Sequence, residues 1–165
     1  MKTLLLLRHG KSSWQGAALP DHDRPLKKRG RRAAEQIGQH LVEQGLIPDH
    51  VLTSTAVRAR KTAALVAEAM KFHGTIEDIP ALYHAEPRTF VAVVSHVPNQ
   101  FDVVLVVGHN PGLEDWLSRL TGCQEEFPTA ALAHVVLPIE DWMDLTLETR
   151  GELRNVWRPK ELADD

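Results

Sequence analysis

The alternation of short apolar runs with segments of helical periodicity is the feature of this sequence that most restricts its fold. The clearest run is Asp102–Val107, in which Val103–Val107 is a continuous apolar, mostly β-branched stretch that ends at Gly108. Shorter runs at Thr3–Leu7 and Asp49–Thr53 also predict strands, as does a weaker one at Thr75–Ile79. Continuous apolar runs of this length are typical of strands that are buried on both faces of a parallel sheet.

Segments with helical spacing separate these strands. The predicted helices cover Gly30–Gln44, Ala56–Met70, a stripe from Phe90 to Val97, and a stretch from Asn110 to Gly122. For the last of these we expect Asn110 as the N-cap and Pro111 at the first helical position. Two further strands are predicted at Leu132–Leu137 and Glu152–Arg158, and Ile139–Thr149 stays ambiguous. The order of elements predicts an α/β fold with a mainly parallel central sheet flanked by helices on both faces.

Length and composition narrow the classes of function. A chain of 165 residues has room for one domain, here 1–165, and can bury a core without disulfides. The net charge of −3 argues against general nucleic-acid binding, and the single cysteine, Cys123, cannot form an internal disulfide. The leucine run that follows Thr3 stops at Arg8, too short for a signal peptide or a membrane span. We therefore expect a cytoplasmic protein with no membrane and no nucleic-acid partner.

Three polar clusters follow three of the predicted strands. Arg8-His9-Gly10 follows the first strand, Ser54 to Arg58 follows the second, and Gly108-His109-Asn110 follows the strand at 102–107. Because ligands of open α/β sheets bind outside the carboxyl ends of the strands, these clusters are expected to meet at one edge.

The residue types in these clusters suit a phosphoryl group. Arginine pairs bidentately with phosphate oxygens, and a helix N-terminus adds amide donors. An imidazole, from His9 or His109, could attack phosphorus and form a covalent phosphoenzyme that water later cleaves. The sequence has no obvious cluster of metal ligands, which fits a site that works without a metal or another cofactor.

The same motifs resemble those of a known family. Leu7-Arg8-His9-Gly10, which contains an RHG motif, the segment Ser54–Ala63 and the segment Val107–Gly112 resemble three ordered motifs of the histidine phosphatase superfamily, which has the phosphoglycerate-mutase-like fold. The short chain, Asp21–Leu26 and Arg158–Leu162 are most similar to the SixA-type phosphohistidine phosphatases.

The resemblance implies a role for each matching residue. His9 would be the nucleophile that becomes phosphorylated, and Arg8, Arg58 and His109 would hold the phosphate and the transition state. Lesser phosphate contacts would come from Ser54, Gly10 and the amide of Asn110. No metal is implied.

The general acid is the open question. The mutase branch of the family uses a glutamate after the third strand region, and Glu86 matches that position loosely. Asp21 and Asp23, on the loop after His9, are competing candidates. A phosphohistidine releases a neutral imidazole once its ring nitrogen is protonated, so it needs a dedicated acid less than a phosphoester does. We therefore expect a phosphatase acting on protein-bound phosphohistidine or a related phosphoramidate or phosphomonoester.

Other functions stay open on the sequence. They are a small-molecule phosphomonoester phosphatase or mutase on the same fold, a phosphoprotein-binding module without turnover, and a metal-dependent hydrolase that uses His9 and His109 as ligands. The run Lys27–Arg32, with five basic residues in six positions, is either a solvated helix start or a docking strip for an acidic phosphorylated protein. Relatives often carry Ser or Thr where Lys27 stands, and a lysine side chain cannot cap a helix N-terminus. The sequence leaves the oligomeric state open.

Overall fold

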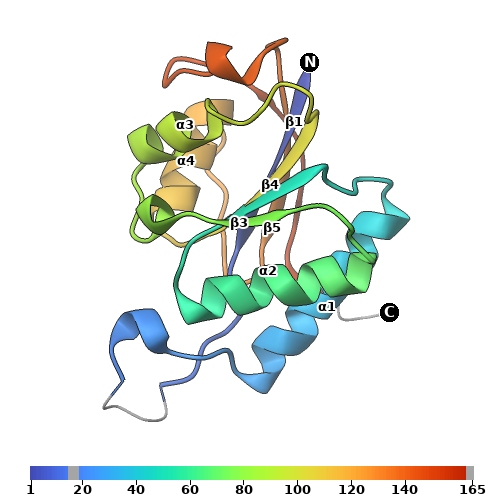
Figure 1. Cartoon of the computed structure of the whole chain (residues 1–165), viewed down its shortest axis with the longest axis vertical. Helices are drawn as coiled ribbons and strands as arrows, with labels where there is room; N and C mark the ends of the chain where they lie inside the picture. Colours follow the sequence, from blue (N-terminus) through green and yellow to red (C-terminus); the bar gives the residue numbers. More distant parts are fainter. Residues whose placement is uncertain (15–18, 163–165) are drawn as a thin grey trace.

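One six-stranded sheet forms the centre of the protein within residues 1–14 and 19–162, the part of the chain described by this computed structural model (Figure 1). The strands are β1 (Lys2–Arg8), β2 (His50–Thr53), β3 (Ile76–Asp78), β4 (Val103–Gly108), β5 (Leu132–Leu137) and β6 (Glu152–Trp157). They are arranged in the order β3-β2-β4-β1-β5-β6. The first four strands along the chain pair in parallel, whereas β5 is antiparallel to both β1 and β6. The mainly parallel sheet predicted from the sequence is confirmed.

Helices cover both faces of this sheet, as expected. They are α1 (Lys28–Glu43), α2 (Val57–Met70), α3 (Pro87–Val94), α4 (Gly112–Thr121) and α5 (Pro159–Leu162), with short 3-10 turns η1 (Asp21–Asp23), η2 (Pro80–Leu82) and η3 (Trp142–Asp144). The α3–α4 pair lies on one side of the strands and the α1–α2 pair on the other (Figure 1). The ambiguous stretch Ile139–Thr149 contains only η3.

Strand periodicity divides the core between the two faces. Successive side chains of a strand point to opposite faces, so Leu4 and Leu6 pack in the core under α3 and α4, whereas Leu5 and Leu7 pack under α1 and α2. These four leucines are fully buried. The continuous apolar run of β1 therefore serves two cores at once, which is why it does not alternate with polar residues.

The register of the parallel strands brings three chain segments to one edge. Arg8 of β1 lies opposite Gly108 of β4, and Thr53 of β2 lies opposite Val107. The chain therefore leaves β1, β2 and β4 at nearly the same level of the sheet. Because β5 is antiparallel, its amino-terminal end lies at this same edge, and the Ala130 amide donates to the Arg8 carbonyl at 3.0 Å.

One helix start differs from its prediction. Helix α4 begins at Gly112 with Pro111 at the cap position, so the assignment of Asn110 as N-cap and Pro111 as first helical residue was wrong by one position. The Asn110 side chain still satisfies an amide of the first turn, because its Oδ1 accepts a hydrogen bond from the Glu114 amide at 3.3 Å. Within the described residues, every helix is too short or too polar to cross a membrane.

Candidate active site

The two histidines predicted to act together lie side by side where β1 and β4 end. The His9 amide donates to the Gly108 carbonyl at 3.1 Å, which continues the β1–β4 pairing by one residue. The ring centroids of His9 and His109 are 5.0 Å apart, and both residues are buried. Strand register, rather than any local motif, thus sets the distance between the two imidazoles.

A hydrogen bond to the backbone determines which nitrogen of His9 is free. Nδ1 lies 2.7 Å from the carbonyl oxygen of Gly10. A carbonyl oxygen can only accept, so Nδ1 carries the proton and the neutral ring has its lone pair on Nε2. The Arg58 Nε–H donates to this Nε2 at 3.4 Å. His9 therefore presents a nucleophilic nitrogen next to a guanidinium.

Gly10 supports His9 by close packing. A Cβ on Gly10 would meet the carbonyl oxygen of Gly30 in α1 at 2.7 Å, a separation that requires glycine at this position. The Gly10 amide donates to Thr62 Oγ1 at 3.0 Å, and the Thr62 hydroxyl donates to the Arg58 carbonyl at 2.7 Å. The Gly10 amide is thus engaged by Thr62 and helps to position the loop, and the phosphate contact expected of Gly10 stays a prediction.

Ser54 orients His109. Its Oγ lies 2.7 Å from His109 Nε2 and accepts a hydrogen bond from the Ala56 amide at 3.1 Å. The hydroxyl can therefore donate its own proton to Nε2, and the neutral His109 ring then carries its proton on Nδ1. That Nδ1 is buried and has no partner among the described residues. Ser54 is fully buried behind the ring, so it acts through His109 and not as a direct contact to a ligand.

Arg58 is held by Asp21 of η1. Its Nη1 donates to the Asp21 carbonyl at 2.6 Å, and its Nη2 lies 3.0 Å from Asp21 Oδ2. The Tyr83 hydroxyl donates to the same carboxylate oxygen at 2.6 Å. These contacts fix the guanidinium of a residue that is only 4% exposed, near the start of α2.

Arg8 is positioned by a ring of hydrogen bonds that the sequence did not reveal. Its Nη1 donates to the Phe127 carbonyl at 3.2 Å, and Asn110 Nδ2 donates to the same oxygen at 2.8 Å. The Phe127 amide in turn donates to Glu114 Oε1 at 3.0 Å, and the Glu114 amide donates to Asn110 Oδ1. Phe127 is anchored by its buried phenyl ring in the core. Arg8 Nε is buried without a partner among the described residues.

These groups surround a cavity of about 380 Å³ at the carboxyl end of the sheet. It is lined by Arg8, His9, Lys11, Ser12, Trp14, Asp21, Arg24, Arg58, His84, His109, Asn110 and Thr129. Several of them were not among the predicted site residues. Lys11 and Ser12 directly follow the RHG motif, a signal that could have indicated them, whereas Thr129 precedes an antiparallel strand and carries no such signal.

Burial and positive neighbours keep both imidazoles neutral. Desolvation, followed by the nearby charges of Arg58, Arg8 and Arg24, lowers the pKa of His9 to about 4, although the Gly10 carbonyl opposes the shift. Desolvation, followed by His9 and Arg58, lowers the pKa of His109 to about 3. At neutral pH the His9 ring is therefore unprotonated at Nε2, as a nucleophile requires.

The three candidate acids differ in their distance from this chemistry. Glu86 is an exposed residue at the cap position of α3, and Asp23 is an exposed residue that contacts His22; neither lines the cavity. Asp21 does line it. Hydrogen bonds from Tyr83 and then from Arg58 and Arg24 hold the pKa of Asp21 well below its usual range. Asp21 is therefore ionised at neutral pH, so it cannot donate a proton and instead compensates the charge of Arg58.

Within residues 1–14 and 19–162, no three His, Cys, Asp or Glu side chains are grouped so that they could hold a metal ion. What the cavity does provide is the guanidinium groups of Arg8, Arg24 and Arg58, a buried imidazole with an unpartnered nitrogen, and a second imidazole with an unprotonated Nε2. This set can hold a tetrahedral oxyanion and attack its central atom.

Comparisons with known proteins agree with this geometry. Residues 4–85 match the model of the histidine phosphatase superfamily, branch 1. An uncharacterized protein of Mycobacterium tuberculosis strain H37Rv is 36% identical over 155 residues, which cover 84% of this chain and 91% of that protein. An uncharacterized chloroplastic protein of Arabidopsis thaliana is 32% identical over 142 residues, which cover 80% of this chain and 65% of the longer plant protein.

Among solved structures, that of Nakamurella multipartitia SixA, a protein assigned as a phosphohistidine phosphatase, superposes with a TM-score of 0.82. It is 31% identical, and the superposition covers 96% of both chains. The neighbouring histidines at the ends of β1 and β4, the two arginines beside them and these relatives lead to one conclusion: the chain belongs to the histidine phosphatase superfamily.

Proposed function

We propose that this protein is a metal-independent phosphatase that hydrolyses protein-bound phosphohistidine through a phosphoenzyme formed at Nε2 of His9. The observation that carries the proposal is the state of His9. Its proton is held on Nδ1 by the Gly10 carbonyl, its lone pair lies on Nε2, and that nitrogen is 3.4 Å from Arg58 Nε in an oxyanion-binding cavity.

In the first step, His9 Nε2 attacks phosphorus while the bond from phosphorus to the leaving group breaks. His9 becomes a phosphorylated imidazolium that keeps its proton on Nδ1, where it is hydrogen-bonded to the Gly10 carbonyl, and the leaving group departs with the electron pair of its bond to phosphorus. Arg8, Arg58 and His109 stabilise the negative charge on the equatorial phosphoryl oxygens.

In the second step, water attacks phosphorus and the P–Nε2 bond breaks. The electron pair returns to Nε2, and His9 leaves as the same neutral Nδ1–H tautomer, while the proton of water goes to solvent or phosphate. This departure needs no acid because the leaving ring is already protonated on Nδ1.

The absence of an available acid among the three candidates favours phosphohistidine as substrate. An alkoxide is a poor leaving group unless it is protonated, and ionised Asp21 cannot supply that proton. A phosphohistidine that is protonated on its other ring nitrogen leaves as neutral imidazole. By this argument a phosphoramidate reacts faster than a phosphomonoester.

The rim of the cavity favours a protein substrate. Trp14 is 72% exposed, and Lys11, Asp21 and His84 are also exposed while they line the cavity. A site with an accessible rim can receive a phosphorylated side chain that projects from another protein.

The test is hydrolysis of potassium phosphoramidate and of a phosphohistidine-bearing protein by the wild type, by His9→Ala and by Asp21→Asn, each with and without a chelator. We expect phosphate release by the wild type that is unaffected by chelator and lost in His9→Ala. Asp21→Asn should retain phosphoramidate hydrolysis. Tight binding without release would instead identify a phosphoprotein-binding module. A loss in Asp21→Asn as large as in His9→Ala would contradict the acid-free mechanism.

A further inference from the structure

A strongly basic surface lies next to the catalytic cavity, and neither the fold nor the reaction accounts for it. Lys27, Lys28, Arg29, Arg31 and Arg32 are all exposed at the start of α1. We call these five side chains the α1 basic surface. In the view of Figure 1 the start of α1 lies at the same end of the molecule as the carboxyl end of β1.

This surface opposes helix stability. Positive charge at a helix N-terminus is unfavourable because the helix dipole places partial positive charge at that end. The cap residue, Lys27, makes no side-chain hydrogen bond to the first turn, and that turn contains no acidic residue. Within the described part of the chain, none of the five side chains forms an ion pair. A protein of net charge −3 thus keeps five cationic side chains without an ion pair, among the described residues, at the start of α1.

The α1 basic surface is firmly attached to the catalytic loop. Gly30, in the middle of the basic run, packs so closely on Lys11 that a Cβ would collide with the Lys11 carbonyl. The Lys27 amide donates to the same carbonyl at 2.8 Å. Since Lys11 follows the RHG motif by one residue, the basic side chains have a defined position relative to His9.

A hollow of about 520 Å³ lies on this surface. It is lined by Ser13, Pro25, Leu26, Lys27, Lys28, Arg29 and Arg31. The preceding residues on both strands of this loop, Ser12 and Arg24, line the cavity itself. An isolated bridge between Ser12 and Leu26 holds the two strands together. The hollow and the cavity are therefore lined by neighbouring residues of the same two chain segments, so the basic side chains lie within a few residues of the site.

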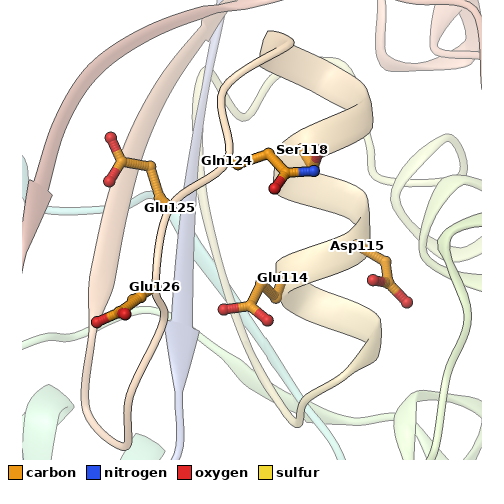
Figure 2. Close-up of a pocket in the computed structure, with 6 residues that line it drawn as sticks. All are labelled: Glu114, Asp115, Ser118, Gln124, Glu125 and Glu126. Carbon is orange, nitrogen blue, oxygen red and sulfur yellow. The ribbon is translucent and has the colours of Figure 1, made fainter.

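A hollow beside α4 has the opposite charge. This second hollow, of about 320 Å³, lies between α4 and the segment before β5, and Glu114, Asp115, Glu125 and Glu126 line it with Ser118 and Gln124 (Figure 2). The Glu114 amide donates to Oδ1 of Asn110, a residue that lines the cavity. An acidic segment would be repelled there and attracted at α1, so the charges around the site give a docked segment a direction.

Resting on the proposed function, we propose that the α1 basic surface binds an acidic segment of the phosphorylated protein, adjacent to its phosphohistidine. The contact would raise the rate of productive encounter and lower KM, with no effect on the chemistry at His9.

The experiment compares two synthetic peptides, each with a single phosphohistidine, that differ only in whether glutamates or lysines flank it. We expect the wild type to hydrolyse the acidic peptide with a kcat/KM about 10-fold higher at low salt, a preference that salt weakens. Lys28→Gln/Arg29→Gln should reduce this ratio toward one and leave kcat/KM for phosphoramidate unchanged.

A matched control removes the same two charges elsewhere. Lys71→Gln/Arg154→Gln changes an exposed lysine at the end of α2 and an exposed arginine of β6, and should keep the wild-type preference. Equal hydrolysis of both peptides by the wild type, or a preference that survives Lys28→Gln/Arg29→Gln, would overturn the inference. Failure to hydrolyse either peptide or phosphoramidate would refute the proposed function itself.

A lipid surface is the competing partner for a basic patch. Co-sedimentation with vesicles of phosphatidylcholine and phosphatidylglycerol distinguishes the two. Binding to these vesicles that depends on Lys28 and Arg29, together with equal hydrolysis of the two peptides, would assign the surface to membranes and overturn the inference.

Discussion

Cationic side chains lie at both ends of the β1–β4 strand pair, but the groups that surround them differ. At the amino end Lys2, 3% exposed, donates to the carbonyls of Asn99 and Phe101 at 2.8 and 3.2 Å and to Asp102 Oδ1 at 3.0 Å. At the carboxyl end Arg8 and Arg58 are crowded against two buried imidazoles.

The two ends differ in how far their polar groups are paired within the protein. The Lys2 ammonium has one fixed acceptor for each of its three protons. Arg8 Nε and His109 Nδ1, by contrast, have no partner among the described residues. His50 Nδ1, near the amino end, also lacks a partner there, but its ring stacks on Phe101 at 4.8 Å and its Nε2 lies 3.1 Å from Glu77. An anion would supply acceptors to the cationic groups at the carboxyl end, whereas the Lys2 ammonium at the amino end already has its three acceptors within the protein.

Removing an arginine from the cavity should give the largest effect. We expect Arg58→Ala to lower kcat/KM for phosphoramidate by about 100- to 1000-fold, because one fixed donor to the transferring phosphoryl group is lost. The free energy of unfolding should change little, since the same substitution relieves repulsion among crowded cations. Steady-state kinetics and urea unfolding test both parts. Activity within a few-fold of wild type would remove Arg58 from the site.

The protonation of the cavity histidines should differ from that of an ordinary histidine. The pKa of His9 is lowered to about 4 and that of His109 to about 3, so both rings should stay neutral as the pH falls from 7 to 5. Between pH 6.5 and 4 these two histidines bind protons in the unfolded chain but not in the folded cavity. The free energy of unfolding should therefore decline as the pH falls through this range. An NMR titration of the histidine ring carbons measures these values directly.

Inorganic phosphate provides the control for that titration. Its negative charge should raise both apparent pKa values, because an anion favours the imidazolium form. A midpoint near 6.5 for His9 in the absence of phosphate would contradict the desolvated cavity described above.

At the amino end, Lys2→Met should reduce stability and spare activity. The substitution leaves buried carbonyl acceptors without their donor, at a cost of about 1–3 kcal/mol in the free energy of unfolding. Urea unfolding measures the loss, and phosphoramidate hydrolysis at a temperature where the variant stays folded should match the wild type. A selective loss of kcat in the folded variant would show that the two ends of the sheet are coupled.

The smallest effect is expected from the hydrogen-bond ring behind Arg8. Glu114→Ala removes the acceptor of the Phe127 amide and should lower kcat/KM by about 3- to 10-fold through a higher KM, since Arg8 loses alignment. Glu114→Gln keeps an acceptor oxygen and should restore most of the activity. Equal losses in both variants would mean that the carboxylate charge matters and the hydrogen bond does not.

Much of this arrangement could be predicted from the residues, and the parts that could not share a physical cause. The strands ending at Arg8, Thr53 and Gly108 were evident as apolar runs, so the meeting of three polar clusters at one sheet edge followed from parallel pairing. Phe127 and Thr129 were missed because they precede β5, and only its antiparallel direction brings that end to the site.

Tertiary contacts also distinguish the candidate acids from one another. Glu86 and Asp21 are both carboxyl groups on loops, and the sequence treats them alike. In the fold, Glu86 is exposed outside the cavity, whereas Asp21 meets the Arg58 guanidinium and the Tyr83 hydroxyl.

Periodicity and residue chemistry are local properties, so the order of strands and helices, the family motifs and the candidates His9, Arg8, Arg58 and His109 could all be identified from the residues. The unprotonated nitrogen of His9, the lowered pKa values of both imidazoles and the partners of each arginine became evident only in the folded chain. Those properties depend on desolvation and on neighbours contributed by β1, α2, η1 and the segment before β5, and such distances exist only after the chain has folded.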